Sequence, residues 1–383
     1  MTRRFSSAWW WSFWLSIVAV TCQQAWARSN NNNVTPPSSR TIQADTSTNN
    51  QTCETTESRW SEHNVQQVLE AWNFTDEQQW QFMELHSRLS DINHWKNDPA
   101  ELARFIKEHN FHVEKAETMF RAMIEWRRDN HVDTFMERYG QPPTLFHYAP
   151  LFLLKGLDHD GDPIFVQRIG VLDGWGMYHK LGDTAMMDAL LFVSEVHTSR
   201  DVGIPEQFQW QKQYYEPVAG RRVTQFTILV DLEGLSMQLL RPALLSIVQR
   251  SARIGQDYYP GLAKRIILVR GPRLFHMAWK IAVNFYDQRV HDKFIFSGKD
   301  DYLQVLSQYM DLDVLPPVLY PEGGKGSPMP GFFEKIHMEG GPLPDHTDDD
   351  DDDNGDDGGD DVTTTQTASN PSLLPDMTAA ASA

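Results

Sequence analysis

Four short apolar runs, separated by segments with helical spacing, restrict the fold of this chain more than any other feature. The runs cover residues 164–168, 226–230, 266–269 and 293–296. Apolar residues without alternation are typical of strands in a sheet that is buried along its length. Helical patterns lie between and after the runs, at residues 184–197, 238–254, 274–286 and 301–310. Strands that alternate with helices predict an α/β fold with a mainly parallel sheet flanked by helices.

Helical patterns also fill the chain before this region. Thr75 and Gln78 fit a capping box, and Asp98-Pro99 fits an N-cap followed by Pro at the first helical position. We expect an N-terminal helical bundle over residues 59–140 and an α/β domain over residues 141–326. Apolar residues recur at helical spacing through the bundle: Val65, Val68, Leu69, Trp72, Trp80, Met83, Ile92, Leu102, Phe105, Ile106, Val113, Ala116, Met119, Phe120, Met123 and Ile124.

The first 27 residues contain the three parts of a secretory signal peptide. Arg3 and Arg4 precede an apolar run over residues 8–22, and Ala25-Trp26-Ala27 fits a small-x-small cleavage site. An uncleaved signal anchor is the alternative. The leader predicts the secretory pathway or an endomembrane lumen, and a peripheral position on cytosolic membrane faces is the alternative location.

Two polar segments are expected to be disordered. Residues 28–58 are rich in Asn, Ser and Thr and predict a linker. Residues 342–383 form a tail with ten Asp between Asp348 and Asp361, more than half of the net charge of -18. Like charges repel, so this tail is expected to stay solvated, and a protein partner through the acidic tail is possible. Asn33, Asn50 and Asn73 each begin an Asn-x-Thr triplet, the acceptor pattern for N-glycosylation.

Signals for catalysis or metal binding are weak. Two cysteines exclude a disulfide scaffold or a multi-cysteine metal site. Residues 158–162 begin like a calcium loop, but Pro163 and Ile169 stand where the loop needs Gly and a bidentate Glu. Phosphate-binding glycine motifs and a nucleophile elbow are absent from the sequence. We therefore expect no metal, no cofactor and no enzyme activity.

A basic region contains one unusually apolar segment. Between Arg221 and Lys293 there are 12 Lys or Arg and 5 Asp or Glu, a difference of +7. Such a region favours an anionic surface, and its apolar character favours a membrane over nucleic acid. Within it, residues 274–286 are apolar almost all round, which predicts a helix that is either buried or in lipid.

Several segments, in this order over about 220 residues, resemble the CRAL-TRIO lipid-binding domain family, which includes phosphatidylinositol transfer proteins and tocopherol- and retinal-binding proteins. The matching segments are Leu102-Ala103-Arg104-Phe105-Ile106, Met123-Ile124-Glu125-Trp126-Arg127, Asp158 to Val166, Val230 to Ser236, Gln256-Asp257-Tyr258-Tyr259-Pro260, Gly271-Pro272, Leu315-Pro316 and Glu322-Gly323-Gly324. The resemblance implies a sheet that forms the floor of an apolar pocket, closed by a mobile gate helix.

The resemblance also implies which residues form the site. The lipid-lining set is Phe165, Gln167, Phe192, Val196, Ile228, Val230 and Trp279. The gate set is Leu274, Phe275, Met277, Ala278, Ile281, Ala282, Val283 and Phe285. The set expected at the membrane or headgroup is Arg250, Lys264, Arg265, Arg270 and Arg273.

The function implied is binding of one lipid or other hydrophobic molecule and its transfer between membranes. The alternative is a lipid-sensing adaptor that regulates a partner without net transfer, and an enzyme ranks below both. Relatives that hold phosphatidylinositol carry an acidic residue where this chain has Arg250, and a Lys where it has Val283. The resemblance therefore does not extend to the ligand.

Overall fold

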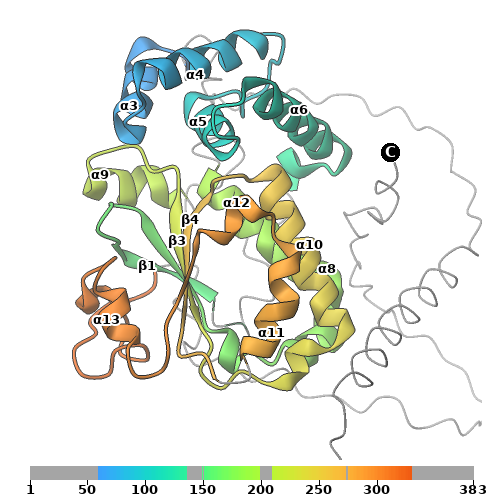
Figure 1. Cartoon of the computed structure of the whole chain (residues 1–383), viewed down its shortest axis with the longest axis vertical. Helices are drawn as coiled ribbons and strands as arrows, with labels where there is room; N and C mark the ends of the chain where they lie inside the picture. The colour runs from blue at the N-terminus through green and yellow to red at the C-terminus, as the bar shows by residue number, and fades with distance from the viewer. Residues whose placement is uncertain (1–58, 136–148, 150, 199–208, 273–274, 330–383) are drawn as a thin grey trace, which may run out of the picture. The chain divides into compact units, whose positions relative to one another are not determined.

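The computed structural model describes residues 59–135, 149, 151–198, 209–272 and 275–329 (Figure 1). The leader, the linker at residues 28–58 and the acidic tail lie outside the described residues, as do Arg273 and Leu274. The side chains of residues 276–278, which include Met277 and Ala278, are also outside them.

Within residues 59–135, four α-helices precede the sheet: α3 (Glu62–Trp72), α4 (Asp76–Arg88), α5 (Pro99–Glu108) and α6 (Val113–Asp129). The capping box at Thr75 is present in both directions, and the Asp98 side chain accepts a hydrogen bond from Ala100 N at 2.9 Å. Both predicted helix starts are confirmed. Helix α4 ends at Arg88, so Ile92 lies beyond it, and Phe82 and Leu85 rather than Trp80 and Met83 form its buried side.

The sheet has five strands in the order β1-β2-β3-β4-β5. They are β1 (Leu151–Leu157), β2 (Pro163–Gln167), β3 (Phe226–Asp231), β4 (Ala263–Val269) and β5 (Phe294–Phe296). Strand β1 is antiparallel to β2, and the other neighbours are parallel. The mainly parallel sheet is confirmed, while β1 was not expected because Lys155 and Gly156 interrupt its apolar run.

Helices α8 (Gly174–Thr198), α10 (Pro242–Tyr258) and α11 (Phe275–Ala282) lie in the connections between successive parallel strands. Crossovers of one hand in a sheet with sequential strand order put their helices on the same side. Figure 1 shows these three helices together on one side, with α13 (Tyr302–Leu306) on the other. The short α9 (Glu216–Ala219) and α12 (Gln288–His291) complete the chain between these elements.

All three crossover helices differ from the sequence prediction. Helix α10 spans Pro242–Tyr258 rather than residues 238–254, and a separate 3₁₀ turn, Met237–Leu240, precedes it. Helix α8 begins ten residues before the expected start at residue 184, and it is interrupted at Gly182, whose φ of 75° is one that glycine adopts freely. Helix α11 ends at Ala282 and continues as a 3₁₀ turn, Val283–Phe285, rather than running to residue 286. The Asn284 amide donates to Lys280 O at 2.8 Å, where it competes with the backbone for that carbonyl.

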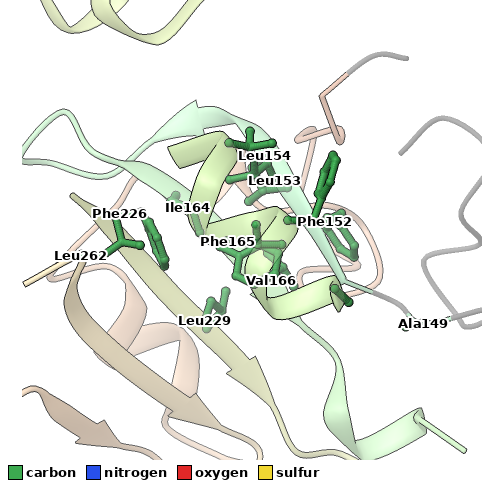
Figure 2. Packing of buried hydrophobic residues seen from close by; sticks show 14 of the residues in the cluster. Ala149, Phe152, Leu153, Leu154, Ile164, Phe165, Val166, Phe226, Leu229 and Leu262 are labelled. Atoms are coloured by element: carbon green, nitrogen blue, oxygen red, sulfur yellow. The ribbon is translucent and has the colours of Figure 1, made fainter. Parts of the chain in front are cut away.

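The largest hydrophobic core joins the strands β1 to β4 to the elements on both sides of the sheet. Figure 2 shows Phe152, Ile164, Val166 and Leu229 packed within it. All four side chains are fully buried. A second core holds α3 to α6 together, with Phe105 and Phe120 in edge-to-face contact at 5.1 Å. The helical region therefore has a core of its own.

Candidate functional site

The register of the sheet separates its side chains into two faces. Phe165 pairs with Ile228 and Ile228 with Ile266, and paired residues in neighbouring strands point to the same side. We call the side that carries Phe165, Gln167, Ile228, Val230, Ile266, Leu268, Phe294 and Phe296 the inner face. The outer face carries Ile164, Val166, Thr227, Leu229, Asp231, Ile267 and Val269.

The two faces are packed differently, although both are covered. On the outer face of the central strand, Thr227, Leu229 and Asp231 are each 0% exposed. On the inner face of the same strand, Ile228 is partly exposed and Val230 is 9% exposed. In β4, Ile267 is likewise 0% exposed while its neighbour Ile266 is partly exposed. Close packing leaves almost no accessible surface in a core, so the inner face of β3 and β4 is less completely buried than the outer face.

Helix α11 covers the part of the inner face near β5 with aromatic side chains. The Trp279 ring lies 4.7 Å from that of Phe294 and 4.9 Å from that of Phe296, both edge-on. Phe275 lies 6.0 Å from Phe296. Ile281 is 42% exposed, so α11 presents aromatic residues to the sheet and at least one large apolar residue to solvent. Ala282, Val283 and Phe285 are partly exposed.

Helix α8 covers the inner face near β2. His197 lies 4.3 Å from Phe226 and 6.4 Å from Phe165, measured between ring centroids. Phe192 and Val196, two expected lining residues on this helix, are 1% and 4% exposed and belong to the main core. Phe165 on the inner face is likewise 4% exposed and part of this core. The other four expected lining residues lie on the inner face or against it: Gln167, Ile228, Val230 and Trp279.

A buried ionic network joins the helical region to the α/β domain, and the sequence prediction missed it. Arg127 of α6 donates two hydrogen bonds to Glu195 of α8, at 2.8 and 2.9 Å, and the Tyr259 hydroxyl donates to the same carboxylate at 2.6 Å. Burial alone would raise the pKa of Glu195, but Arg127 and Lys96 outweigh it and lower the pKa to about 2. This carboxylate is ionised at every physiological pH.

His197 lies two residues after Glu195 on α8 and is held neutral. It is 3% exposed, and its Nδ1 lies 2.7 Å from Val193 O. Burial lowers the pKa of His197 to about 4. A small polar cavity of about 20 Å³ borders His197, Thr198 and Arg222, which is room for about one water molecule.

The basic residues expected at the membrane do not form one patch. Lys264 and Arg265 lie at the start of β4, and Arg270 follows its end. Lys264 Nζ is 2.9 Å from Asp162 Oδ2, and Arg265 Nη1 is 3.1 Å from Asp158 Oδ2. A hydrogen bond from Arg265 lowers the pKa of Asp160 to about 2. The acidic turn at residues 158–162, first considered as a calcium loop, thus holds these two cations.

Arg270 and Arg250 are paired as well. Arg270 is 8% exposed and donates to Asp231 at 2.9 and 2.6 Å, and Arg168 donates to the same carboxylate at 3.0 Å. Arg250 Nη2 is 2.9 Å from Asp183 Oδ2. The sequence could not reveal these pairs, because in each the partners are at least 39 residues apart. Four of the twelve cations behind the excess of +7 are therefore paired with carboxylates.

Apolar side chains are exposed instead at the carboxyl edge of the sheet. Val171 follows β2 and is 40% exposed, Met237 follows β3 and is 51% exposed, and Phe296 ends β5 and is 46% exposed. The carboxyl ends of parallel strands lie at the same edge of a sheet, so these three residues lie at one edge. Helix α11 follows the carboxyl end of β4 and therefore begins at this edge as well. Arg241 stacks over the Trp175 ring beside them, at 4.0 Å. We call Val171, Met237 and Phe296 the apolar edge.

Three further observations on the described residues bear on function. An open groove of about 470 Å³ lies between α6 and the last turn of α10, lined in part by Met119, Ala122 and Tyr258, and no sheet residue lines it. Among the residues that the structure describes, no group of three His, Cys, Asp or Glu side chains could hold a metal ion. Within the same residues, no helix combines the length and apolar character needed to cross a bilayer.

Comparison with known proteins agrees with this geometry. Residues 149–319 match the model of the CRAL/TRIO domain. Protein real-time of Drosophila melanogaster is 31% identical over 71% of this chain and 40% of its own length. SEC14 cytosolic factor of Eremothecium gossypii is 27% identical over 62% of this chain and 74% of its own length. The structure titled "Crystal structure of Sfh5" aligns with 68% of this chain and 91% of its own, with a TM-score of 0.46 and 15% identity.

The match has a defined extent. The chain spans about two fifths of the length of the fruit-fly real-time proteins. The matched residues contain the strands β1 to β5, the helices α8, α10 and α11, and the inner face. The family model thus identifies residues 149–319 of this chain as a CRAL-TRIO domain.

Proposed function

We propose that the chain binds a single phospholipid or other hydrophobic molecule between the inner face and α11, and transfers it between membranes. The main support for this proposal is the difference in burial between the two faces of β3. The outer face of the strand is fully buried, while Ile228 on the inner face remains accessible beneath a layer of helices. An apolar surface with that accessibility is what a lipid chain would cover.

The energetics explain why the lipid would need an enclosed route. Exposure of one CH₂ group to water costs roughly 0.8 kcal/mol, so about 30 of them cost about 20 kcal/mol. Contact with the inner-face residues would offset most of this cost. The carrier must nevertheless open, because the ligand enters and leaves at the membrane.

Helix α11 is the element best suited to open. It meets the sheet through the rings of Phe275 and Trp279 and shows Ile281 to solvent. Arg270, just before the helix, has a φ of 56°, and Gly271-Pro272 follows it. We infer that α11 swings about residues 270–272, and that Ile281 contacts the bilayer in the open state.

Membrane contact would depend more on apolar residues than on charge. The expected cations Lys264, Arg265 and Arg270 are engaged by carboxylates, whereas the apolar edge is exposed beside α11. Insertion of apolar side chains into the interface is insensitive to salt, unlike attraction to anionic lipids. We therefore expect docking that persists at high ionic strength.

The test of the pocket is transfer of fluorescent phospholipid between vesicles by Val230→Trp. The added bulk on the inner face should abolish transfer while the fold persists. Val218→Trp adds the same bulk at a residue that is 63% exposed on α9, and it should transfer like the wild type. Transfer by Val230→Trp at the wild-type rate would contradict the proposed pocket.

The test of the gate uses two variants of α11. Ile281→Ser should slow transfer several-fold with little change in the free energy of unfolding, because the residue is exposed in the closed state. Trp279→Ser should lower stability, because it removes the ring that lies against Phe294 and Phe296. If Ile281→Ser transfers normally, α11 does not meet the bilayer through this face.

A further inference from the structure

The turn between α3 and α4 contains an acceptor triplet that the lipid-binding function does not use. Asn73-Phe74-Thr75 is the one triplet of its kind among Asn33, Asn50 and Asn73 that lies within the described residues. Asn73 is exposed and ends α3 in the left-handed conformation, with φ 49° and ψ 50°. Its backbone N–H donates to Glu70 O at 3.2 Å. Asn73 therefore lies at an exposed turn that follows the helix.

The other two residues of the triplet are fixed by the fold. Phe74 is 7% exposed and meets Phe111 edge-on at 5.1 Å. The Thr75 hydroxyl oxygen accepts a hydrogen bond from Gln78 N at 3.3 Å, and Thr75 N donates to the Gln78 side chain at 3.0 Å. A transferase must bind the triplet as a free segment, so it could act only before this capping box closes.

We propose that Asn73 carries an N-linked glycan, added during synthesis as the leader delivers the chain into the secretory pathway. In this step, Nδ2 of Asn73 forms a bond to C1 of the first sugar. The bond from C1 to the diphosphate of a lipid-linked oligosaccharide breaks, and the amide proton leaves with the diphosphate. No oxidant or reductant is needed.

The folded protein accommodates the product of this reaction. A glycan on an exposed turn residue is bulky and solubilising, and it extends into water without displacing a packed side chain. Asn is also one of the few residues that tolerate the left-handed conformation at such a turn. The position therefore satisfies two separate demands, an accessible amide and room for the sugar.

The experiment expresses the full chain in cells that secrete glycoproteins, with Asn33→Gln and Asn50→Gln as the background, so that Asn73 is the remaining acceptor of the three. The background protein should show a mass shift of one glycan that is removed by an endoglycosidase specific for N-linked sugars. Asn73→Asp should lose the shift and keep the turn, because Asp also tolerates this conformation.

Two changes at Thr75 separate glycosylation from folding. Thr75→Ser keeps both the hydroxyl acceptor and the helix cap, and it should retain the shift. Thr75→Ala should lose the shift and about 1 kcal/mol of cap stability. A background protein without a glycan would overturn the proposal. If it is protected from added protease by the membrane, the leader acts but the site does not, and if it is unprotected, the leader does not act. Lipid transfer, measured on unglycosylated protein, is independent of either result.

Discussion

Two neighbouring residues of the central strand provide a test of the inner face by stability alone. Leu229 and Ile228 have isomeric side chains, so their truncation to Ala removes the same three carbons. Leu229 is 0% exposed on the outer face, and Ile228 is partly exposed on the inner face. If both faces were packed alike, the two substitutions would cost nearly the same free energy of unfolding.

We expect different costs because the two sites have different surroundings. Leu229→Ala leaves a cavity inside a filled core, and such changes cost about 2–5 kcal/mol, so we expect about 3 kcal/mol. Ile228 is already partly exposed, so its truncation should lose fewer contacts and create less new cavity. We expect about 1 kcal/mol for Ile228→Ala, a difference of about 2 kcal/mol between the variants.

The assay is urea unfolding of lipid-free protein, followed by circular dichroism. Removal of lipid matters because a ligand that binds the native state adds stability according to its concentration. The slopes of the unfolding curves should agree among the variants, so that the midpoints report stability. Equal losses from Leu229→Ala and Ile228→Ala would refute the conclusion that the inner face is incompletely packed.

Three further outcomes follow from charged and titratable groups. Burial lowers the pKa of His197 to about 4, so the unfolded chain binds this proton before the folded chain does as the pH falls below 6.5. The free energy of unfolding of the wild type should therefore fall by about 3 kcal/mol between pH 6.5 and 4. In urea titrations His197→Gln should lose less stability over that range, and an equal loss would contradict the assignment. Glu195→Gln leaves the buried Arg127 with less than its full countercharge, and the free energy of unfolding should fall by about 3 kcal/mol in the same assay. No change in stability would show that the ion pair is dispensable. The double variant Lys264→Gln/Arg265→Gln should bind anionic vesicles within twofold of the wild type in flotation assays. A strong loss of binding would show that these two cations do contact the membrane.

Local patterns in the sequence were sufficient for the starts of α4 and α5 and for the parallel strands. Capping at Thr75 and Asp98 depends on residues no more than three positions apart, and the structure has both. The apolar runs gave β2 to β5 within a few residues. Strand β1 was missed although it begins with four apolar residues, Leu151 to Leu154, which Lys155 and Gly156 follow.

Long-range pairing explains what the sequence could not provide at the site. The charge of residues 221–293 suggested a basic surface, but the partners of Lys264 and Arg265 lie about a hundred residues earlier in the chain. The ion pair between Arg127 and Glu195 could likewise not be predicted, because the two residues are 68 positions apart. The alternation of β3 did allow the lining residues Ile228 and Val230 to be assigned to one side, because side-chain alternation is a local property.

Native mass spectrometry of the purified chain, after incubation with phospholipid vesicles, tests the central claim most directly. The account predicts one lipid molecule per wild-type chain, and Val218→Trp should load in the same way. Val230→Trp should remain folded and carry no lipid, since its added ring occupies the inner face. Wild-type protein without bound lipid, or Val230→Trp with the same lipid content as wild type, would contradict the account.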